Sequence, residues 1–192
     1  MMKIALFGGA FNPLTKGHAI CAREILKHGF DKVWFVPCNV SASSKILASG
    51  KDRINMCNIV SNKIPNVETC DVEIKYNLTG TPYDILTTIL KKYKNDHTQF
   101  YFAMGLDNAN SVYSWPEYEK SLDAIPFVIL PRGNSSRKSE KEWYDKDPHI
   151  YFSSMLPLHI SSTQFKQEYS STGTSDLVEK DILEYIKEHK LY

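Results

Sequence analysis

Short apolar runs alternate with amphipathic stretches along this chain. Five apolar runs have the length of buried strands, at 4–7, 33–36, 100–104, 127–130 and 150–152, and the stretch 67–74 alternates like an edge strand. Apolar residues recur at helical spacing at 19–28, 52–60, 82–93, 162–169 and 175–189. Strands separated by helices imply βαβ units. We therefore expect a single α/β domain over residues 1–192, Rossmann-like, with a mostly parallel central sheet flanked by helices.

The composition argues against several classes of protein. Hydrophobic residues make up 42% of the 192 residues, and the formal net charge of +1 offers no general attraction to nucleic acid or membranes. No apolar segment has the length of a membrane span, and the run at 4–7 is too short for a signal peptide. The four cysteines are scattered, which favours free thiols in a reducing compartment. We expect a cytoplasmic protein without nucleic-acid or membrane partners, and the sequence leaves open whether it forms a homo-oligomer.

The stretch 8–18, GGAFNPLTKGH, joins the first predicted strand to the first predicted helix. Such a turn suits phosphate, because glycines let the backbone approach an anion and the helix N-terminus favours negative charge. The spacing differs from the G-x-G-x-x-G of dinucleotide-binding enzymes, and the Gly-Lys-Ser/Thr ending of a P-loop is missing. His18 falls in the first helical turn, where it would face a bound phosphate or, alternatively, cap its own helix.

Four of the predicted strands end at a glycine or proline. These residues are Gly8, Pro37, Gly105 and Pro131. Ligands of parallel sheets bind beyond the carboxyl ends of the strands. We therefore expect the residues that follow these four positions to line one crevice.

Two motifs resemble those of the nucleotidyltransferase superfamily. The stretch 8–18 is similar to its G-x-F-x-P-x-(H/T)-x-G-H signature, and the stretch 160–166, ISSTQFK, is similar to the I-S-S-T-x-x-R motif of its adenylyltransferases. The resemblance spans most of the chain and implies an α/β fold that transfers a nucleotidyl group from a nucleoside triphosphate. A phosphate oxygen of the acceptor attacks the α-phosphorus and pyrophosphate leaves. This reaction needs positioned cations and N–H donors, with no activated nucleophile on the enzyme.

The resemblance assigns phosphate contacts to the first motif. His18 would be the catalytic residue and would donate a hydrogen bond to the α-phosphate; whether its ring is charged stays open, because the helix N-terminus and the triphosphate act in opposite directions. Thr15 stands where many relatives have a further histidine. The remaining residues of this motif implied to contact ATP are Gly8, Gly9, Phe11 and Gly17.

The second motif is implied to hold the β- and γ-phosphates through hydroxyl and backbone N–H groups, unless its hydroxyls only cap a helix. Its residues are Ile160, Ser161, Ser162, Thr163 and Lys166. Lys166 stands at the arginine position of the motif, so it keeps the charge and loses the bidentate fork. The resemblance also implies phosphate contacts for Lys45, with Arg53 as an alternative, and places Arg132 near the adenine or the phosphates.

The stretch Gly105-Leu106-Asp107 resembles the G-x-D of nicotinate- and nicotinamide-mononucleotide adenylyltransferases. The resemblance implies that Asp107 accepts a hydrogen bond from a ribose hydroxyl and that Trp115 stacks on the pyridine ring. A turn-forming aspartate and a core tryptophan are the alternatives. Asp84 keeps the acidic place of a family S-Y-T-x-D stretch, but Pro82 replaces the threonine that helps to recognise the nicotinate carboxylate. Both acceptors therefore stay open.

The resemblance thus implies an adenylyltransferase of NAD biosynthesis. It would transfer AMP from ATP to nicotinate mononucleotide, or to nicotinamide mononucleotide, and release pyrophosphate. Mg²⁺ is expected to arrive with ATP, and no metal site built by the protein is expected. The alternatives are another adenylyl- or cytidylyltransferase, such as one acting on phosphopantetheine, and a nucleotide-binding regulatory protein without catalysis.

Overall fold

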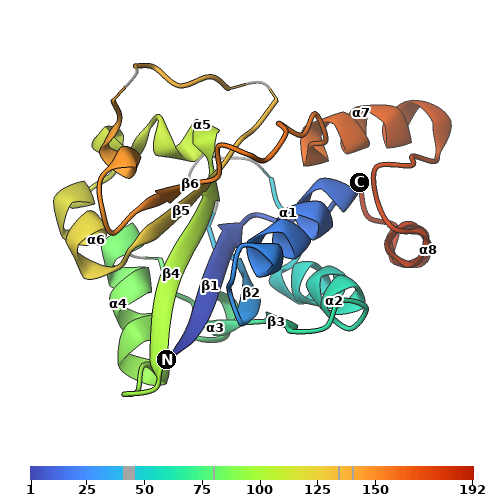
Figure 1. Ribbon diagram of the computed structural model, residues 1–192. Helices are drawn as coiled ribbons and strands as arrows, with labels where there is room; N and C mark the ends of the chain where they lie inside the picture. The colour runs from blue at the N-terminus through green and yellow to red at the C-terminus, as the bar shows by residue number, and fades with distance from the viewer. Residues whose placement is uncertain (41–45, 80, 134, 140) are drawn as a thin grey trace.

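The fold is built around one six-stranded parallel sheet (Figure 1). We describe it from a computed structural model, which covers residues 1–40, 46–79, 81–133, 135–139 and 141–192. The strands lie in the order β3-β2-β1-β4-β5-β6. Their bounds are Met2–Gly9 for β1, Lys32–Pro37 for β2, Val67–Thr69 for β3, Thr98–Gly105 for β4, Phe127–Leu130 for β5 and Ile150–Tyr151 for β6. The predicted α/β class and the parallel sheet are confirmed.

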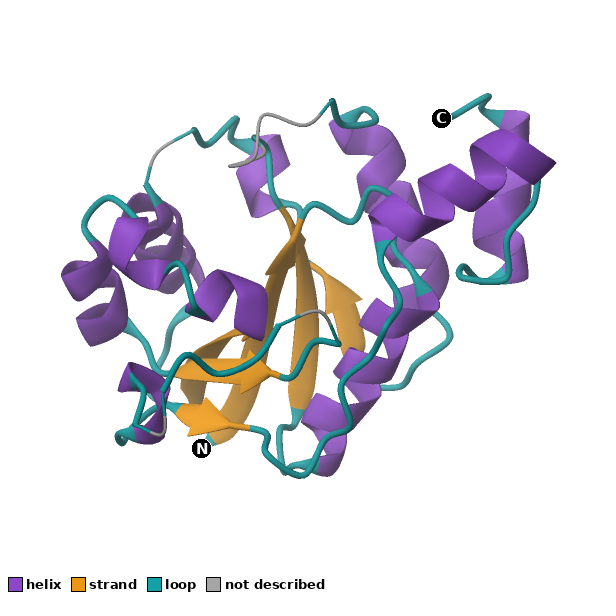
Figure 2. Ribbon diagram, turned by 90° about the horizontal axis from the view of Figure 1, so that it is seen from above, coloured by secondary structure: helices purple, strands orange, loops and turns teal. Residues whose placement is uncertain are grey.

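Helices cover both faces of the sheet, as the view from above shows (Figure 2). Their bounds are Lys16–Lys27 for α1, Gly50–Ser61 for α2, Val72–Lys75 for α3, Pro82–Tyr93 for α4, Leu106–Ala109 for α5, Tyr118–Ala124 for α6, Ser162–Thr172 for α7 and Lys180–Glu188 for α8. Two short 3-10 turns, η1 (Val112–Ser114) and η2 (Trp143–Asp145), complete the described elements. No helix among the described ranges is long and apolar enough to cross a membrane.

Two predicted elements have the wrong extent. The stretch 67–74 was expected to be one strand, but β3 ends at Thr69 and α3 begins at Val72. Val72 of α3 is fully buried and Ile74 only partly, and the alternation of these apolar residues with Glu73 resembled that of a strand. The last helix was expected from residue 175, but α8 begins at Lys180, and Val178 is a buried residue of the connection before it.

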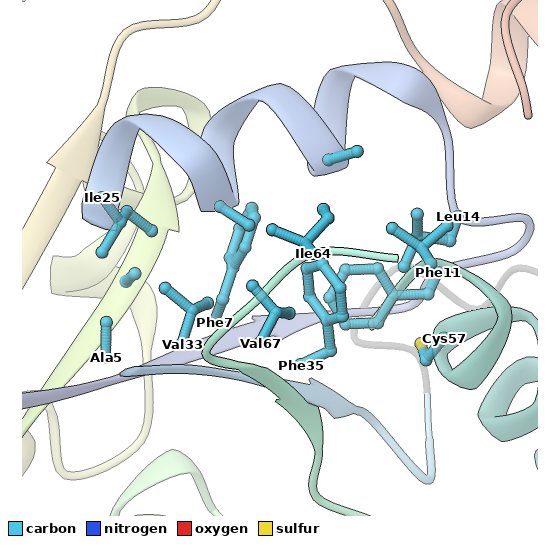
Figure 3. Packing of buried hydrophobic residues seen from close by; sticks show 14 of the residues in the cluster. Ala5, Phe7, Phe11, Leu14, Ile25, Val33, Phe35, Cys57, Ile64 and Val67 are labelled. Atoms are coloured by element: carbon cyan, nitrogen blue, oxygen red, sulfur yellow. The ribbon is translucent and has the colours of Figure 1, made fainter. Parts of the chain in front are cut away.

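The core lies on both faces of β1, because its side chains alternate between them. Ala5 and Phe7 pack under α1 and α2, together with Phe35 of β2 and Ile25 of α1 (Figure 3). Leu6, which lies between them in β1, belongs to a second cluster under α4 and α5. Burial on both faces explains why the strands read as continuous apolar runs.

The sheet order places the functional edge of the molecule. From β1 the chain passes to β2 on one side, and it returns later to β4 on the other side. The connections after β1 and β4 therefore leave the sheet in opposite directions and open a crevice between the carboxyl ends of these strands. In open parallel sheets this reversal point is where ligands bind.

Candidate active site

One cavity of about 1660 Å³ lies beyond the carboxyl ends of β1, β2, β4 and β5. The residues at or directly after these strand ends line it, as the sequence predicted: Gly8, Cys38, Gly105 and Pro131. Pockets for a single drug-sized ligand are typically about 300–1,000 Å³. The cavity is therefore large enough for two nucleotide-sized molecules at once.

The turn after β1 is shaped by close packing around its glycines. A Cβ on Gly8 would lie 2.5 Å from Cζ of Phe102, and a Cβ on Gly9 would lie 3.1 Å from Cζ of Phe11. Both glycines line the cavity, so their backbone is open to a ligand on one side and pressed against an aromatic ring on the other. Phe11 itself is 1% exposed, and its ring packs edge-on against His18 at 5.1 Å between centroids.

The orientation of His18 is fixed by the N-cap residue of α1. The backbone N–H of Thr15 donates to Nδ1 of His18 at 3.0 Å, and the Thr15 hydroxyl lies 2.9 Å from the same nitrogen. Because a backbone N–H can only donate, Nδ1 must be the acceptor and the proton of a neutral ring sits on Nε2. His18 lines the cavity, so the ring has a hydrogen-bond donor to offer to a ligand.

The charge state of His18, which the sequence left open, follows from its surroundings. Burial lowers the pKa of His18 to about 3, and the positive charge of Arg132 acts in the same direction. The ring is therefore neutral near pH 7 in the unliganded protein. Thr15, expected to contact phosphate, is 1% exposed and uses its hydroxyl on His18.

The two motifs from opposite ends of the chain meet in space. The hydroxyl of Ser162 donates to the carbonyl oxygen of Pro13 at 2.8 Å, across 149 residues of sequence. A Cβ on Gly17 would lie 3.1 Å from Cβ of Ile160, so the absence of a side chain at Gly17 lets α1 pack tightly against the residues before α7. The N-termini of α1 and α7 therefore border the same cavity.

The three hydroxyls of the second motif have different tasks. Ser161 caps α7, because its Oγ accepts from the N–H of Gln164 at 3.1 Å. Ser162 joins the two motifs as described. Thr163 is exposed and lines the cavity, and within the described part of the chain no hydrogen bond is seen for its hydroxyl. Lys166, one turn further along α7, also lines the cavity.

An ion pair lies where β4 and β5 end. Nη1 of Arg132 is 3.4 Å from Oδ2 of Asp107, and both side chains are partly exposed at the cavity. A Cβ on Gly105 would lie 2.5 Å from Oδ1 of Asp107, so the glycine lets this carboxylate fold back beside the strand end. The influence of Arg132 on the pKa of His18 places its charge on the same side of the cavity as the first motif.

Of the residues predicted to bind the acceptor, some line the cavity and one caps a helix. Trp115 is half-buried after η1 and lines the cavity, as does Pro82 at the first turn of α4. Asp84 is exposed and caps α4: its Oδ2 accepts from the N–H and the hydroxyl of Thr81, both at 2.9 Å, and these bonds lower its pKa. Lys45 lies outside the described residues.

Arg53, weighed as an alternative phosphate-binding cation, has another task. It is 2% exposed, and its guanidinium donates to the carbonyls of Ala10, Cys38 and Ala48 at 2.6–3.1 Å. It therefore ties the turn after β1 to the segments around β2 and α2, and it does not line the cavity.

One buried carboxyl lines the cavity without having been predicted from the sequence. Glu73 of α3 is 6% exposed, and its Oε2 accepts from the N–H of Asn39 at 3.2 Å. Burial raises its pKa to about 7. The stretch around it was expected to be part of an edge-like strand. A short helix there turns the side chain inward.

The sheet is open and parallel, and the N-termini of α1 and α7 share one cleft at its carboxyl edge. This combination is typical of α/β enzymes that bind nucleotides. Hydrogen-bond donors from both helix N-termini border this cavity, and among the described residues that line it no nucleophile is seen hydrogen-bonded to a base. This arrangement suits nucleotidyl transfer, which needs positioned donors and cations. The chain belongs to the cytidylyltransferase-like family, whose model matches residues 6–172. The superfamily resemblance read from the two motifs is thereby confirmed.

Similar proteins agree in name and extent. A protein of Caldicellulosiruptor bescii named a probable nicotinate-nucleotide adenylyltransferase is 31% identical, and the match covers 100% of this chain and 99% of the relative. The Bacillus subtilis nicotinate-nucleotide adenylyltransferase is 24% identical over 100% and 99% of the two chains. Among solved structures, the Plasmodium falciparum nicotinic acid mononucleotide adenylyltransferase complexed with NaAD has a TM-score of 0.81 at 23% identity, covering 100% of this chain and 98% of that one. The last likeness concerns the fold.

Proposed function

We propose that this protein is a nicotinate-nucleotide adenylyltransferase of NAD biosynthesis. It transfers AMP from ATP to nicotinate mononucleotide, forms the dinucleotide and releases pyrophosphate. The observation that carries the proposal is the meeting of both phosphate motifs, joined by the hydrogen bond from Ser162 to Pro13, at a cavity with room for two nucleotides. The names of relatives that match the whole length of the chain support the same activity.

In the proposed complex, the N-termini of α1 and α7 bind different phosphates of the triphosphate. The α-phosphate lies at the N-terminus of α1, within reach of the Nε2–H of His18. The β- and γ-phosphates lie at the N-terminus of α7, where Thr163 and Lys166 line the cavity. A phosphate oxygen of the mononucleotide attacks the α-phosphorus in line, the bond to the bridging oxygen breaks, and pyrophosphate leaves with the electron pair.

His18 contributes as a neutral donor. Negative charge grows on the non-bridging oxygens of the α-phosphate in the transition state, and a preorganised hydrogen bond becomes stronger as it does. Thr15 holds Nδ1, so the ring needs no reorientation when the reaction occurs. The charge of the polyanion is balanced by Arg132 and Lys166, not by the imidazole.

Mg²⁺ enters this reaction as part of the substrate complex with ATP. No group of three metal-ligating side chains is found within the described ranges. Asp107, a carboxylate that lines the cavity, is paired with Arg132. This donor set fits a cation held by phosphate oxygens and water, the usual state of Mg²⁺ with ATP.

The acceptor is proposed to bind between α4 and η1. Trp115 offers a ring for stacking, and Asp107 at the end of β4 offers a carboxylate to a ribose hydroxyl. Pro82 lines this region and has no N–H to give to the nicotinate carboxylate. The preference for the acid over the amide therefore rests on the names of the relatives, and the cytoplasmic location and the oligomeric state stay predictions.

A pyrophosphate-release assay tests the proposal. Purified protein is given ATP and Mg²⁺ with nicotinate mononucleotide, nicotinamide mononucleotide or phosphopantetheine in separate reactions. We expect the highest kcat/KM with nicotinate mononucleotide and stoichiometric dinucleotide. Highest turnover with the amide would correct the acceptor, turnover only with phosphopantetheine would move the protein to another branch of the family, and no turnover with any of the three would reject the enzyme.

A further inference from the structure

Tyr192 lies at the cavity although no motif includes it. Lys190, Leu191 and Tyr192 follow α8 and line the cavity near α7. Figure 1 marks this end of the chain close to α7. The Tyr192 ring packs edge-on against Phe165 of α7, with 6.2 Å between ring centroids. It is therefore seated against the helix that begins with the second phosphate motif.

The hydroxyl of Tyr192 is anchored to the first motif. It donates to Oδ1 of Asn12 at 2.6 Å, and burial raises the pKa of Tyr192, so the hydroxyl keeps its proton. Asn12 is 5% exposed and is itself held in place: Oδ1 also accepts from the N–H of Ala48 at 2.9 Å, and its amide donates to the carbonyl of Ile46 at 3.1 Å. The residue as a whole is 43% exposed, but its hydroxyl is tied to a side chain that two further hydrogen bonds hold in place.

The face of the same ring meets a cation of the second motif. Nζ of Lys166 lies 4.5 Å from the centroid of the Tyr192 ring. An ammonium group at this distance from an aromatic face is attracted by it. A lysine has four rotatable bonds, so a contact that restrains its ammonium group at the cavity lowers the entropy lost when a phosphate binds it.

We propose that Tyr192 is a positioning residue of the triphosphate subsite: anchored on Asn12, its ring holds the ammonium group of Lys166 where the β- and γ-phosphates bind. The proposal rests on the proposed function in one respect, because it takes the polyanion to be the triphosphate of ATP. It adds a residue outside both motifs to the phosphate site. It also gives the segment after α8 a task in substrate binding.

The test compares two variants that both lack the hydroxyl. Tyr192→Phe keeps the ring and Tyr192→Leu removes it, so their ratio isolates the ring. ATP affinity is measured by calorimetry with Mg²⁺ and without an acceptor, in the wild-type background and with Lys166→Met. With Lys166 present we expect Tyr192→Leu to bind ATP about 3- to 5-fold more weakly than Tyr192→Phe, the size of a cation–π contact. In the Lys166→Met background we expect the two to bind equally.

Two controls separate positioning from stability. AMP has no β- or γ-phosphate, so its affinity should be the same in Tyr192→Leu and Tyr192→Phe. Tyr169→Leu removes another aromatic ring that stacks on Phe165, at 5.5 Å, but lies outside the cavity lining. We expect it to lower the melting temperature and to leave ATP affinity unchanged.

Several results would overturn the proposal. An equal loss of ATP affinity in both Lys166 backgrounds, or an equal loss for AMP, would make the ring a structural element only. No difference between Tyr192→Leu and Tyr192→Phe would remove the role, and tighter ATP binding by Tyr192→Leu would make the ring a competitor of the triphosphate. Binding of ATP by the wild type without turnover of any mononucleotide would refute the proposed function while this comparison still stands, and no ATP binding at all would refute both.

Discussion

The two nitrogens of His18 perform separate tasks, and substitution can separate them. Nδ1 completes the N-cap of α1 by accepting from the N–H of Thr15, and the Nε2–H at the cavity is the donor that we propose for the α-phosphate. Glutamine at the third position of a helix can also accept from the N-cap N–H. His18→Gln therefore keeps the cap but displaces the N–H donor at the cavity. His18→Ala removes both the cap and the donor.

The expected magnitudes differ for the two tasks. Loss of one preorganised donor to a transition-state oxyanion lowers kcat by about 100- to 1,000-fold. Loss of a cap costs about 1 kcal/mol of stability. In steady-state kinetics we expect both variants to lose about 100- to 1,000-fold in kcat. In urea denaturation we expect only His18→Ala to lose about 1 kcal/mol of stability. A His18→Gln variant with wild-type kcat, or an equal loss of ATP affinity and kcat in both variants, would refute the assignment.

The pH dependence tests the neutral state of the ring. The pKa of His18 is about 3 in the folded protein, against an ordinary 6.5. The ring stays neutral throughout pH 5.5–8.5, so the ratio of kcat/KM between wild type and His18→Gln should be constant across that range, whatever the substrates themselves titrate. A ratio that falls below pH 6.5 would show that His18 titrates there and would contradict the argument.

The same shift predicts a loss of stability in acid. Below pH 6.5 the unfolded chain binds a proton at His18 that the folded protein does not bind, so the free energy of unfolding falls as pH drops from 6.5 toward 3. The full slope is about 1.4 kcal/mol per pH unit for one group, and we expect about 2–3 kcal/mol in total because the ring borders an open cavity. Because lowered carboxyl pKa values such as that of Asp52 weaken both proteins in acid, the test is the difference: in urea titrations at pH 4 and 7, wild type should lose about 2–3 kcal/mol more than His18→Gln.

Three further perturbations follow from the contacts of the site. Ser162→Ala removes the donor to Pro13, so we expect the free energy of unfolding in urea to fall by about 1 kcal/mol. We also expect a higher KM for ATP and an unchanged KM for the mononucleotide. A change in stability alone would contradict a role in joining the motifs. Arg53→Met leaves three partly buried carbonyls without this donor, so we expect a loss of about 3 kcal/mol in the same assay. A loss under 1 kcal/mol would show that water replaces the guanidinium. EDTA should stop turnover until Mg²⁺ is restored and should leave the melting temperature of the ATP-free protein unchanged; a lower melting temperature would reveal a metal held by the protein itself.

The sheet and the cleft were predictable because the relevant patterns are local. Strands buried on both faces are short apolar runs, and four of them end at or next to a glycine or proline where the chain turns into the cleft. The extent of α3 was not predictable in this way. A four-residue helix and the end of a strand both place apolar side chains two residues apart, and the packing of Val72 under the sheet decides between them.

The direction of polar side chains was the weaker part of the prediction. Thr15 was expected to contact phosphate, but its hydroxyl lies against His18. Arg53 looked like a surface cation at a helix start, yet its partners are carbonyls from segments far away in the sequence, and no local pattern encodes them. Tyr192 was passed over because an aromatic residue outside the predicted helices carries no sequence signal for what it touches.

In the proposed mechanism, the residues that carry positive charge differ from the residue that donates the catalytic hydrogen bond. With a net charge of +1 for the whole chain, attraction of a polyanion depends on Arg132, Lys166 and two helix N-termini at one cavity. Arg132 also disfavours a proton on His18. In the proposed mechanism the imidazole therefore need not carry charge, because Arg132 and Lys166 supply the positive charge at the cavity. A neutral ring held by Thr15 instead offers one directed donor, whose hydrogen bond strengthens as charge accumulates on the α-phosphate oxygens.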